Sequence, residues 1–408
     1  MPIPVGMSYD LEIGSHERPA RELIERWASE HDLLVDDDLM ISRPAARGDG
    51  HLFSVNGPVP AEPDDFAEDL AAACLAPRWM LTIEVPRPGP KRAIALARSL
   101  ARTLAQETHG AAFDPQEDAL IWPRGEPKRV QPRHKEEATS VVELAWFLPA
   151  RRWPEAPAIL LELLAHRCPE ALPTRYGRFE PLPHRFDPAA PAALAHFMCD
   201  EREGDGFWLA SRPSFGGFWR APHDDPRITP GHEHLRIAQL QVEFDGRVLE
   251  RDPRWREAVV ELFATAATRL GAVFAAAQVG PHWLVSTNNR LWATAKTMRH
   301  GCEHIPFGGR WIGLPPVPMW LSWFGAPYRD LVASHLTEAA LTARGMRRLL
   351  GRAQPPRIED RTDGLLVRLG DEPRPRRSLG PWPLPDELTY RKHQAPRLDD
   401  PAPHIPPL

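Results

Sequence analysis

Histidine and cysteine side chains gather at two places in the sequence where they could bind a metal. His232 and His234 are two residues apart in GHEHLR, so both side chains would lie on one face of a strand. Cys302 and His304 lie close together in RHGCEHIP. Imidazole and thiolate are normal ligands of Zn²⁺. If the two segments meet in the fold, these four residues would form the site of a metal-dependent hydrolase.

The spacing of these residues does not by itself predict an enzyme. Neither segment has the i, i+4 spacing of an HExxH helix, and the four cysteines form no CxxC pair. The chain contains no GxxxxGK[ST] loop, no GxGxxG between a strand and a helix, and no GxSxG turn. We therefore expect no cofactor and a non-enzymatic protein, with the metal-dependent hydrolase as the alternative.

Two other segments, Phe207–Trp219 and Trp311–Tyr328, are rich in aromatic residues, and Arg212, Arg220, Arg310 and Arg329 lie within or beside them. Trp, Tyr and Arg are the residues that most often anchor protein interfaces, so these segments could bind a partner protein. Large rings also dominate the packing of protein cores, which is the alternative. The residues expected to contact a partner are Arg212, Arg220, Trp311, Tyr328 and Arg329.

The stretch LPPVPMWLSWFGAPYRDLV, residues 314–332, combines two Trp, a Phe and a Tyr with four prolines. Its prolines prevent a helix at the start, whereas MWLSWF has the character of a strand. Alternation sends neighbouring side chains to opposite faces, and both faces are largely apolar here. A strand covered on both faces is central in its sheet, which leaves Trp311, Tyr328 and Arg329 as the exposed rim of this stretch.

The first part of the chain alternates strands with helices. Strand patterns occupy residues 7–13, 37–43, 51–59 and 78–86, two short strands follow in 111–123, and helical patterns occupy 18–31, 62–75 and 91–107. This order predicts an α+β fold of the α/β sandwich type, in which helices pack on a sheet. We expect a ferredoxin-like domain over residues 1–125.

A polar, proline-containing segment at 126–140 is the expected linker. Residues 141–380 predict a larger α+β domain with a mixed sheet and an aromatic-rich core, including a strand at 192–201. Its clearest helix begins after Asp252 and Pro253 and ends at Gly271. LAWFLP and LSWFGAP are similar strand ends, so two similarly built units are possible. Prolines become dense over 381–408, which predicts an extended tail.

The segments HLRIAQLQVEFD, WFGAPY and DGLLVRLGDEP follow one another in the second half. This order resembles the broad immunity-protein families that accompany polymorphic and type VI secretion toxins in bacteria, over roughly residues 140–390. The resemblance implies a non-enzymatic cytoplasmic protein that binds and blocks a toxin, and it carries over no catalytic residues. It does not include the N-terminal α/β unit.

Charge and hydropathy narrow the class of partner. The net charge of the 408-residue chain is −5, whereas general nucleic-acid and membrane-surface binders need an excess of basic residues. Basic side chains cluster between Arg124 and Lys135, which keeps a nucleic-acid-associated defence component as a further alternative. The sequence has no recognisable signal peptide and no apolar run of membrane-spanning length. We expect a cytoplasmic protein whose partner is another protein.

Overall fold

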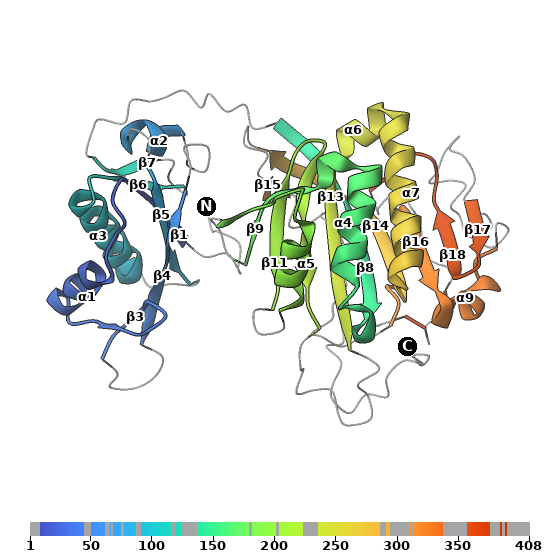
Figure 1. The fold of residues 1–408 in the computed structure, drawn as a ribbon, viewed down its shortest axis with the longest axis horizontal. Helices are drawn as coiled ribbons and strands as arrows, with labels where there is room; N and C mark the ends of the chain where they lie inside the picture. The colour runs from blue at the N-terminus through green and yellow to red at the C-terminus, as the bar shows by residue number, and fades with distance from the viewer. Residues whose placement is uncertain are drawn as a thin grey trace. The chain divides into compact units, whose positions relative to one another are not determined.

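The computed structural model divides the chain into two compact units, Met1–Arg133 and His134–Leu408 (Figure 1). The boundary falls within the segment expected to be the linker. The structure describes residues 9–44, 50–61, 66, 68–74, 77–86, 91–115, 117, 119–123, 137–178, 182–200, 204–222, 236–285, 291–293, 311, 313–337, 357–375, 384–385 and 388–389. Each unit is described by itself.

The first unit contains an antiparallel sheet whose described strands have the order β2-β3-β4-β5-β1-β6-β7. The strands are β1 (Tyr9–Ser15), β2 (Leu34–Val35), β3 (Met40–Ser42), β4 (His51–Pro60), β5 (Trp79–Val85), β6 (Ala111–Asp114) and β7 (Ala119–Trp122). The helices are α1 (Arg21–Glu30), α2 (Glu68–Cys74) and α3 (Lys91–Glu107).

The ferredoxin-like fold expected for this unit is confirmed by its topology. The succession β1-α1-β4-β5-α3-β6 is a βαββαβ motif, and the order β4-β5-β1-β6 places β1 between β5 and β6. The remaining strands extend this motif at both edges: β2 and β3 lie beyond β4, and β7 lies beyond β6. Helices α1 and α3 cover one face of the sheet (Figure 1).

The core of the first unit is formed by apolar residues that recur at helical spacing in α3 and at every second position in β1. The apolar side chains of α3 recur at helical spacing, and Ala93, Ala97, Leu100 and Leu104 are buried. In β1, Leu11 and Ile13 point to the helices, whereas Asp10 and Glu12 point to the other face. One face of the sheet is therefore apolar and buried, and the other is largely polar.

The second unit contains a larger sheet whose described strands have the order β10-β9-β11-β12-β13-β8-β14-β16-β18-β17, with β15 paired to β14. The mixed sheet expected from the sequence is antiparallel at every strand pair within the described residues. The strands are β8 (Glu137–Pro149), β9 (Pro173–Gly177), β10 (His184–Arg185), β11 (Gly206–Ala210), β12 (Ser214–Arg220), β13 (Ile237–Asp245), β14 (Phe274–Val285), β15 (Leu291–Ala293), β16 (Leu321–Gly325), β17 (Arg357–Arg361) and β18 (Gly364–Arg368).

The helices of this unit are α4 (Ala156–Arg167), α5 (Pro191–Cys199), α6 (Gly246–Arg251), α7 (Pro253–Leu270) and α9 (Ala326–Ala333), with short 3-10 turns at Ala150–Arg152 and Pro169–Ala171. The same βαββαβ motif recurs as β8-α4-β12-β13-α7-β14, in the sheet order β12-β13-β8-β14. The other strands extend the motif at both edges, with β11, β9 and β10 beyond β12 and with β16, β18 and β17 beyond β14. Both units are thus built on one topology.

The second sheet has an apolar core on each face. Helices α4 and α7 pack on one face, to which Trp146 of β8 and Trp323 of β16 contribute their side chains. Helix α9 packs on part of the other face, to which Phe274 of β14 and Phe324 of β16 contribute theirs. Every residue of β16 is buried, and β16 lies between β14 and β18. The prediction that this aromatic strand lies inside the sheet and is covered on both faces is therefore confirmed.

Helix α7 begins and ends where the sequence indicates. The Asp252 carboxylate accepts a hydrogen bond from the Arg254 backbone N–H at 2.9 Å, and Pro253 occupies the first turn. Gly271 ends the helix in the left-handed conformation, with φ of 64°. Each end of α7 is determined by one or two residues of a characteristic type, so the sequence alone predicts where the helix begins and ends.

Two expectations for the second unit are wrong. Residues 192–201 were expected to form a strand, but α5 occupies Pro191–Cys199 because Pro191 begins a helix and Leu194 and Met198 share one buried face. Part of the expected tail contributes to the core. Leu384 and Leu388 are buried, and the Leu314 N–H donates to the Leu388 carbonyl at 2.9 Å.

Candidate functional site

Trp311 and Tyr328, two of the residues expected to contact a partner, are buried inside the second unit. Both side chains have 0% exposure, and the Trp311 Nε1–H donates to the Tyr328 hydroxyl at 2.7 Å. Burial also raises the pKa of Tyr328 above its ordinary value. The expectation of an exposed rim at these two residues is therefore wrong, because their polar atoms satisfy each other within the core.

Arg329 follows Tyr328 on α9 but points to the surface. Its guanidinium forms an ion pair with Asp360 of β17 at 2.7 Å and donates to the Thr362 carbonyl at 3.3 Å. These contacts hold α9 against the β17–β18 hairpin. Arg329 remains half-exposed, so a partner could still reach it.

Arg212 and Arg220 lie at the two ends of β12. Arg212 forms an ion pair with the buried Asp245 at 3.6 Å, and Arg220 forms one with Asp205 at 2.7 Å. Strand β12 is separated from β16 by β13, β8 and β14. At ~4.8 Å per strand, these arginines lie roughly 19 Å from the β16–α9 region of Arg329. The five expected residues therefore do not form one compact site.

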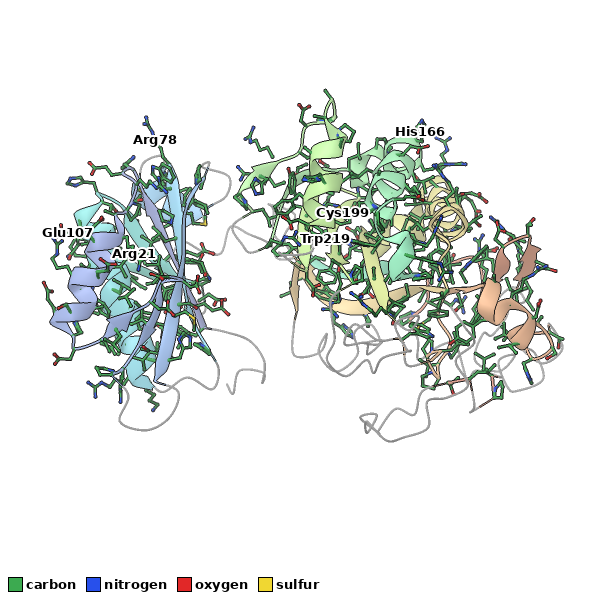
Figure 2. The ribbon with its side chains drawn as sticks, turned by 60° about the horizontal axis from the view of Figure 1, so that its bottom comes forward. Arg21, Arg78, Glu107, His166, Cys199 and Trp219 are labelled. Carbon is green, nitrogen blue, oxygen red and sulfur yellow. The ribbon has the colours of Figure 1, made fainter. Side chains whose placement is uncertain are left out.

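The aromatic segment Phe207–Trp219 contributes mostly to packing. Trp208 and Trp219 are buried and stack with their ring centroids 6.2 Å apart. Gly206 and Gly217 make room for them, because a Cβ at either glycine would meet the Trp219 or the Trp208 ring. The buried aromatic side chains of Phe207–Trp219, among them Trp219 (Figure 2), therefore belong to the core of the second unit.

The residues of the expected metal site, His232, His234, Cys302 and His304, lie outside the described residues, and so does the basic segment Arg124–Lys135. Within the described part of the chain, no group of three or more His, Cys, Asp or Glu side chains is arranged to hold a metal ion. No described helix is long and apolar enough to cross a membrane.

The face of the first sheet that points away from α1 and α3 is largely free of described covering elements. We call it the open sheet face. Helix α2 and Phe66 cover part of this face over β1 and β6, where Phe66, Leu70 and Cys74 pack with Met80, Ala111 and Phe113. Side chains of the remaining strands are half-buried or exposed there, and they come from Asp10, Glu12, Leu34, Met40, Ser42, Ser54, Asn56, Thr82, Glu84 and Leu120.

Each unit places two carboxyl side chains opposite each other on neighbouring central strands. Asp10 of β1 lies directly opposite Glu84 of β5, and Glu143 of β8 lies directly opposite Glu243 of β13. Both pairs occupy the face away from the crossover helices. A pair of neighbouring carboxyl groups is therefore a feature of both units.

The environment of Glu243 differs from that of an exposed carboxylate. Burial raises the pKa of Glu243, although a hydrogen bond from Gln241 Nε2 at 3.0 Å opposes this effect. Gln239 in turn donates to Gln241 at 3.1 Å, which makes a polar ladder along β13. Burial also disfavours the ionised form of Asp245, but hydrogen bonds from Arg247 and Thr139 outweigh it and lower the pKa of Asp245.

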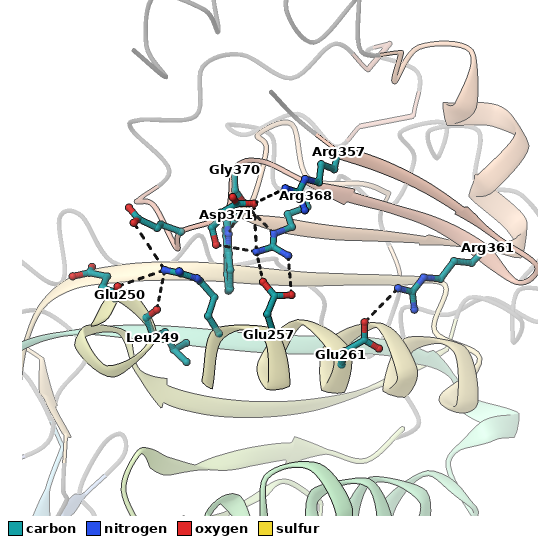
Figure 3. A network of polar contacts seen from close by, with 12 residues as sticks. Leu249, Glu250, Glu257, Glu261, Arg357, Arg361, Arg368, Gly370 and Asp371 are labelled. Atoms are coloured by element: carbon teal, nitrogen blue, oxygen red, sulfur yellow. Dashed lines mark hydrogen bonds and ion pairs between the residues drawn. The ribbon is translucent and has the colours of Figure 1, made fainter. Parts of the chain in front are cut away.

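Ion pairs connect side chains of α7 to side chains of β17 and β18. Arg368 of β18 contacts Glu257 through both carboxylate oxygens, at 2.9 and 3.3 Å, and Arg361 lies 3.9 Å from Glu261 (Figure 3). Only 5% of the Arg368 side chain is exposed. This network joins the hairpin of β17 and β18 to α7, so its role is structural.

No model of a known protein family matches the chain, and no curated protein matches it. Among solved structures, the chain is similar to "Pseudomonas aeruginosa T6SS protein PA0821", at 14% sequence identity and a TM-score of 0.33. The similarity covers 64% of this chain and 78% of that one.

The open sheet face was not among the sites expected from the sequence. A signal for it is present, because acidic and polar residues alternate with apolar ones in YDLEI (9–13) and LTIE (81–84). The alternation indicates one polar face for each strand. It does not say which strands pair, so the carboxylates could not be placed side by side.

Proposed function

We propose that this protein binds another protein in the cytoplasm and acts without catalysis, as an immunity-like or otherwise defence-associated protein. The open sheet face is the observation that supports the proposal. Its half-buried and exposed side chains come from β1, β2, β3, β4, β5 and β7, whereas small-molecule sites are concave and enclose most of their ligand. A broad face of mixed polar and apolar side chains is suited to a protein partner.

The second unit supports the same proposal in a different way. Its charged side chains on α7 and α9 form ion pairs within the unit, and its large aromatic side chains pack in its two cores. These residues stabilise a rigid scaffold. Interface backbones of pre-organised binding proteins move little when the partner binds, and a scaffold of this kind meets that requirement.

Co-expression of the full chain with the product of a neighbouring gene tests the proposal. We expect the two proteins to elute together in size-exclusion chromatography and to remain together at micromolar concentration. An unrelated protein of similar size and charge serves as the control and should elute separately. Separate elution of this chain from each neighbouring gene product would count against a protein-binding function.

A further inference from the structure

We propose that the described residues Leu384, Pro385, Leu388 and Thr389, which we call the strap, form a detachable cover on the core of the second unit. In the closed state, the strap lies against Leu314 and buries two leucine side chains. In the open state, the strap leaves this position while the sheet stays folded. This device does not depend on the proposed protein partner.

The strap contributes two leucines to the core on the face of the second sheet that points away from α4 and α7. Leu384 and Leu388 belong to the same cluster of buried side chains as Leu314, Trp311 and Tyr328. They are the most exposed of the buried side chains in this cluster, at 8% and 6%, whereas Leu314, Trp311 and Tyr328 are at 0%. The strap therefore covers this core from outside and does not form its centre.

The backbone contact between the strap and Leu314 cannot grow into a ladder beyond Leu314. The Leu314 N–H donates to the Leu388 carbonyl at 2.9 Å, and Leu314 and Thr389 form an isolated parallel bridge outside the described strands. In a parallel ladder the next donor along the chain after Leu314 would be residue 316. This residue is Pro316, which has no N–H, so the pairing stops at the bridge in this direction.

The strands of the same core are held by continuous ladders. Strand β16 contributes Phe324 to this core, and it pairs with β18 over all five of its residues and with β14 on its other side. Parts of a protein with few backbone hydrogen bonds and few buried apolar contacts open at the lowest free energy. We therefore expect the strap to open while β16 and its neighbours remain paired.

Opening changes the surface of the second unit. It exposes the side chains of Leu384 and Leu388 on the strap, and it uncovers the part of the core next to Leu314. The uncovered position takes a segment with two leucines four residues apart and a backbone carbonyl for the Leu314 N–H. The strap is the segment of this chain that occupies it, so the device alternates between a covered and an uncovered apolar core.

Hydrogen–deuterium exchange of the full chain, resolved to single amides by fragmentation mass spectrometry, tests the proposal. The Leu314 N–H reports on opening of the strap because its acceptor is the Leu388 carbonyl, whereas the amides of β16 report on unfolding of the sheet. Exchange is measured without urea and at several urea concentrations below the unfolding transition.

We expect the Leu314 amide to exchange at least about a hundredfold faster than the amides of β16, because the strap opens without the sheet. Its rate should change little with urea, because opening of the strap exposes little surface, whereas exchange of the β16 amides should accelerate steeply. Equal protection of Leu314 and β16, with the same dependence on urea, would overturn the proposal.

Two truncations in the same core separate the strap from the sheet. Leu388→Ala removes a strap contact, and Leu365→Ala on β18 is the matched control. We expect Leu388→Ala to accelerate exchange of the Leu314 amide by at least about tenfold and of the β16 amides by less than about threefold, because the lost contact exists only in the closed state. Leu365→Ala should show the reverse order.

Two results for Leu388→Ala would overturn the proposal. Equal acceleration at Leu314 and β16 would show that the strap and the sheet open together. An unchanged rate at Leu314 would show that its exchange does not require the strap to leave. If Leu365→Ala does not fold, the β16 amides of the wild-type chain serve as the reference, and the same two results decide.

Discussion

Glu143 on β8 and Glu243 on β13 lie directly opposite each other on adjacent antiparallel strands. Burial raises the pKa of Glu243, so the folded protein holds a proton on this carboxyl more tightly than the unfolded chain does. The contribution of Glu243 to stability is therefore present at low pH. It is lost as the pH rises from the ordinary glutamate pKa, about 4.3, through the higher pKa of the folded state.

We expect Glu243→Gln to be more stable than the wild type at pH 8, by about 1 kcal/mol, because a neutral amide avoids the cost of ionising a buried carboxyl group. The difference should shrink toward pH 4, where the wild-type carboxyl is protonated. Urea unfolding followed by circular dichroism at several pH values measures it. A Glu243→Gln difference that is constant with pH would contradict the assignment.

The ion pair between Glu257 and Arg368 has the opposite pH dependence. The hydrogen bond from Arg368 lowers the pKa of Glu257, so this pair stabilises the fold above the ordinary glutamate pKa and loses its effect as the pH falls through the lower folded value. We expect Arg368→Ala to lower the free energy of unfolding by about 2 kcal/mol at pH 7, because the side chain is nearly buried.

The exposed pair of Glu162 and Arg269 provides the comparison for this prediction. Its N–O distance is also 2.9 Å, but both side chains are more than a third exposed. Exposed ion pairs contribute about 0–1 kcal/mol. Urea unfolding of Arg269→Ala should therefore give a smaller change than that of Arg368→Ala, and equal changes would show that burial does not decide the strength of the Arg368 contacts.

Tyr328→Phe tests whether the Trp311–Tyr328 hydrogen bond is structural. The variant leaves the buried Trp311 Nε1–H without its acceptor, which should cost about 1–3 kcal/mol of unfolding free energy. Affinity for a protein partner should not change, because neither side chain reaches the surface. Thermal unfolding and a binding titration measure the two effects, and a loss of affinity in a variant of normal stability would return these residues to the interface.

Removal of the α7 cap should destabilise the second unit. Asp252→Ala removes the acceptor of the Arg254 N–H, which should cost about 1 kcal/mol, whereas Asp252→Asn retains an acceptor and should be nearly neutral. Denaturant unfolding of the two variants provides the measurement. Similar losses in both variants would mean that the charge of Asp252 matters more than its hydrogen bond.

The sequence predicts elements well where one residue or one periodic stripe decides them. Helix α3 begins at Lys91 and ends at Glu107 as its apolar stripe indicates, and the alternation of strands and helices predicts the ferredoxin-like first unit. The segment that became α5 was misassigned because its nine residues are apolar on most sides, so their period is ambiguous.

The candidate site was less predictable because it depends on pairing between distant segments. Trp311 and Tyr328 were expected at the surface, but the hydrogen bond that allows both to be buried joins residues that lie 17 positions apart. The pairing of Asp10 with Glu84 depends on the register of β1 and β5, which residue composition does not specify. Faces of single strands can be predicted, whereas the surfaces they build together cannot.

The recurrence of one βαββαβ topology in both units has a consequence for synthesis of the protein on the ribosome. All the described strands of the first sheet and the helices that cover it belong to the first 133 residues. Domains usually fold as units, the N-terminal one first. The nascent chain can therefore bury its first apolar core before the second unit has left the exit tunnel, which separates two similar sets of strands in time and lowers the chance that they pair with each other.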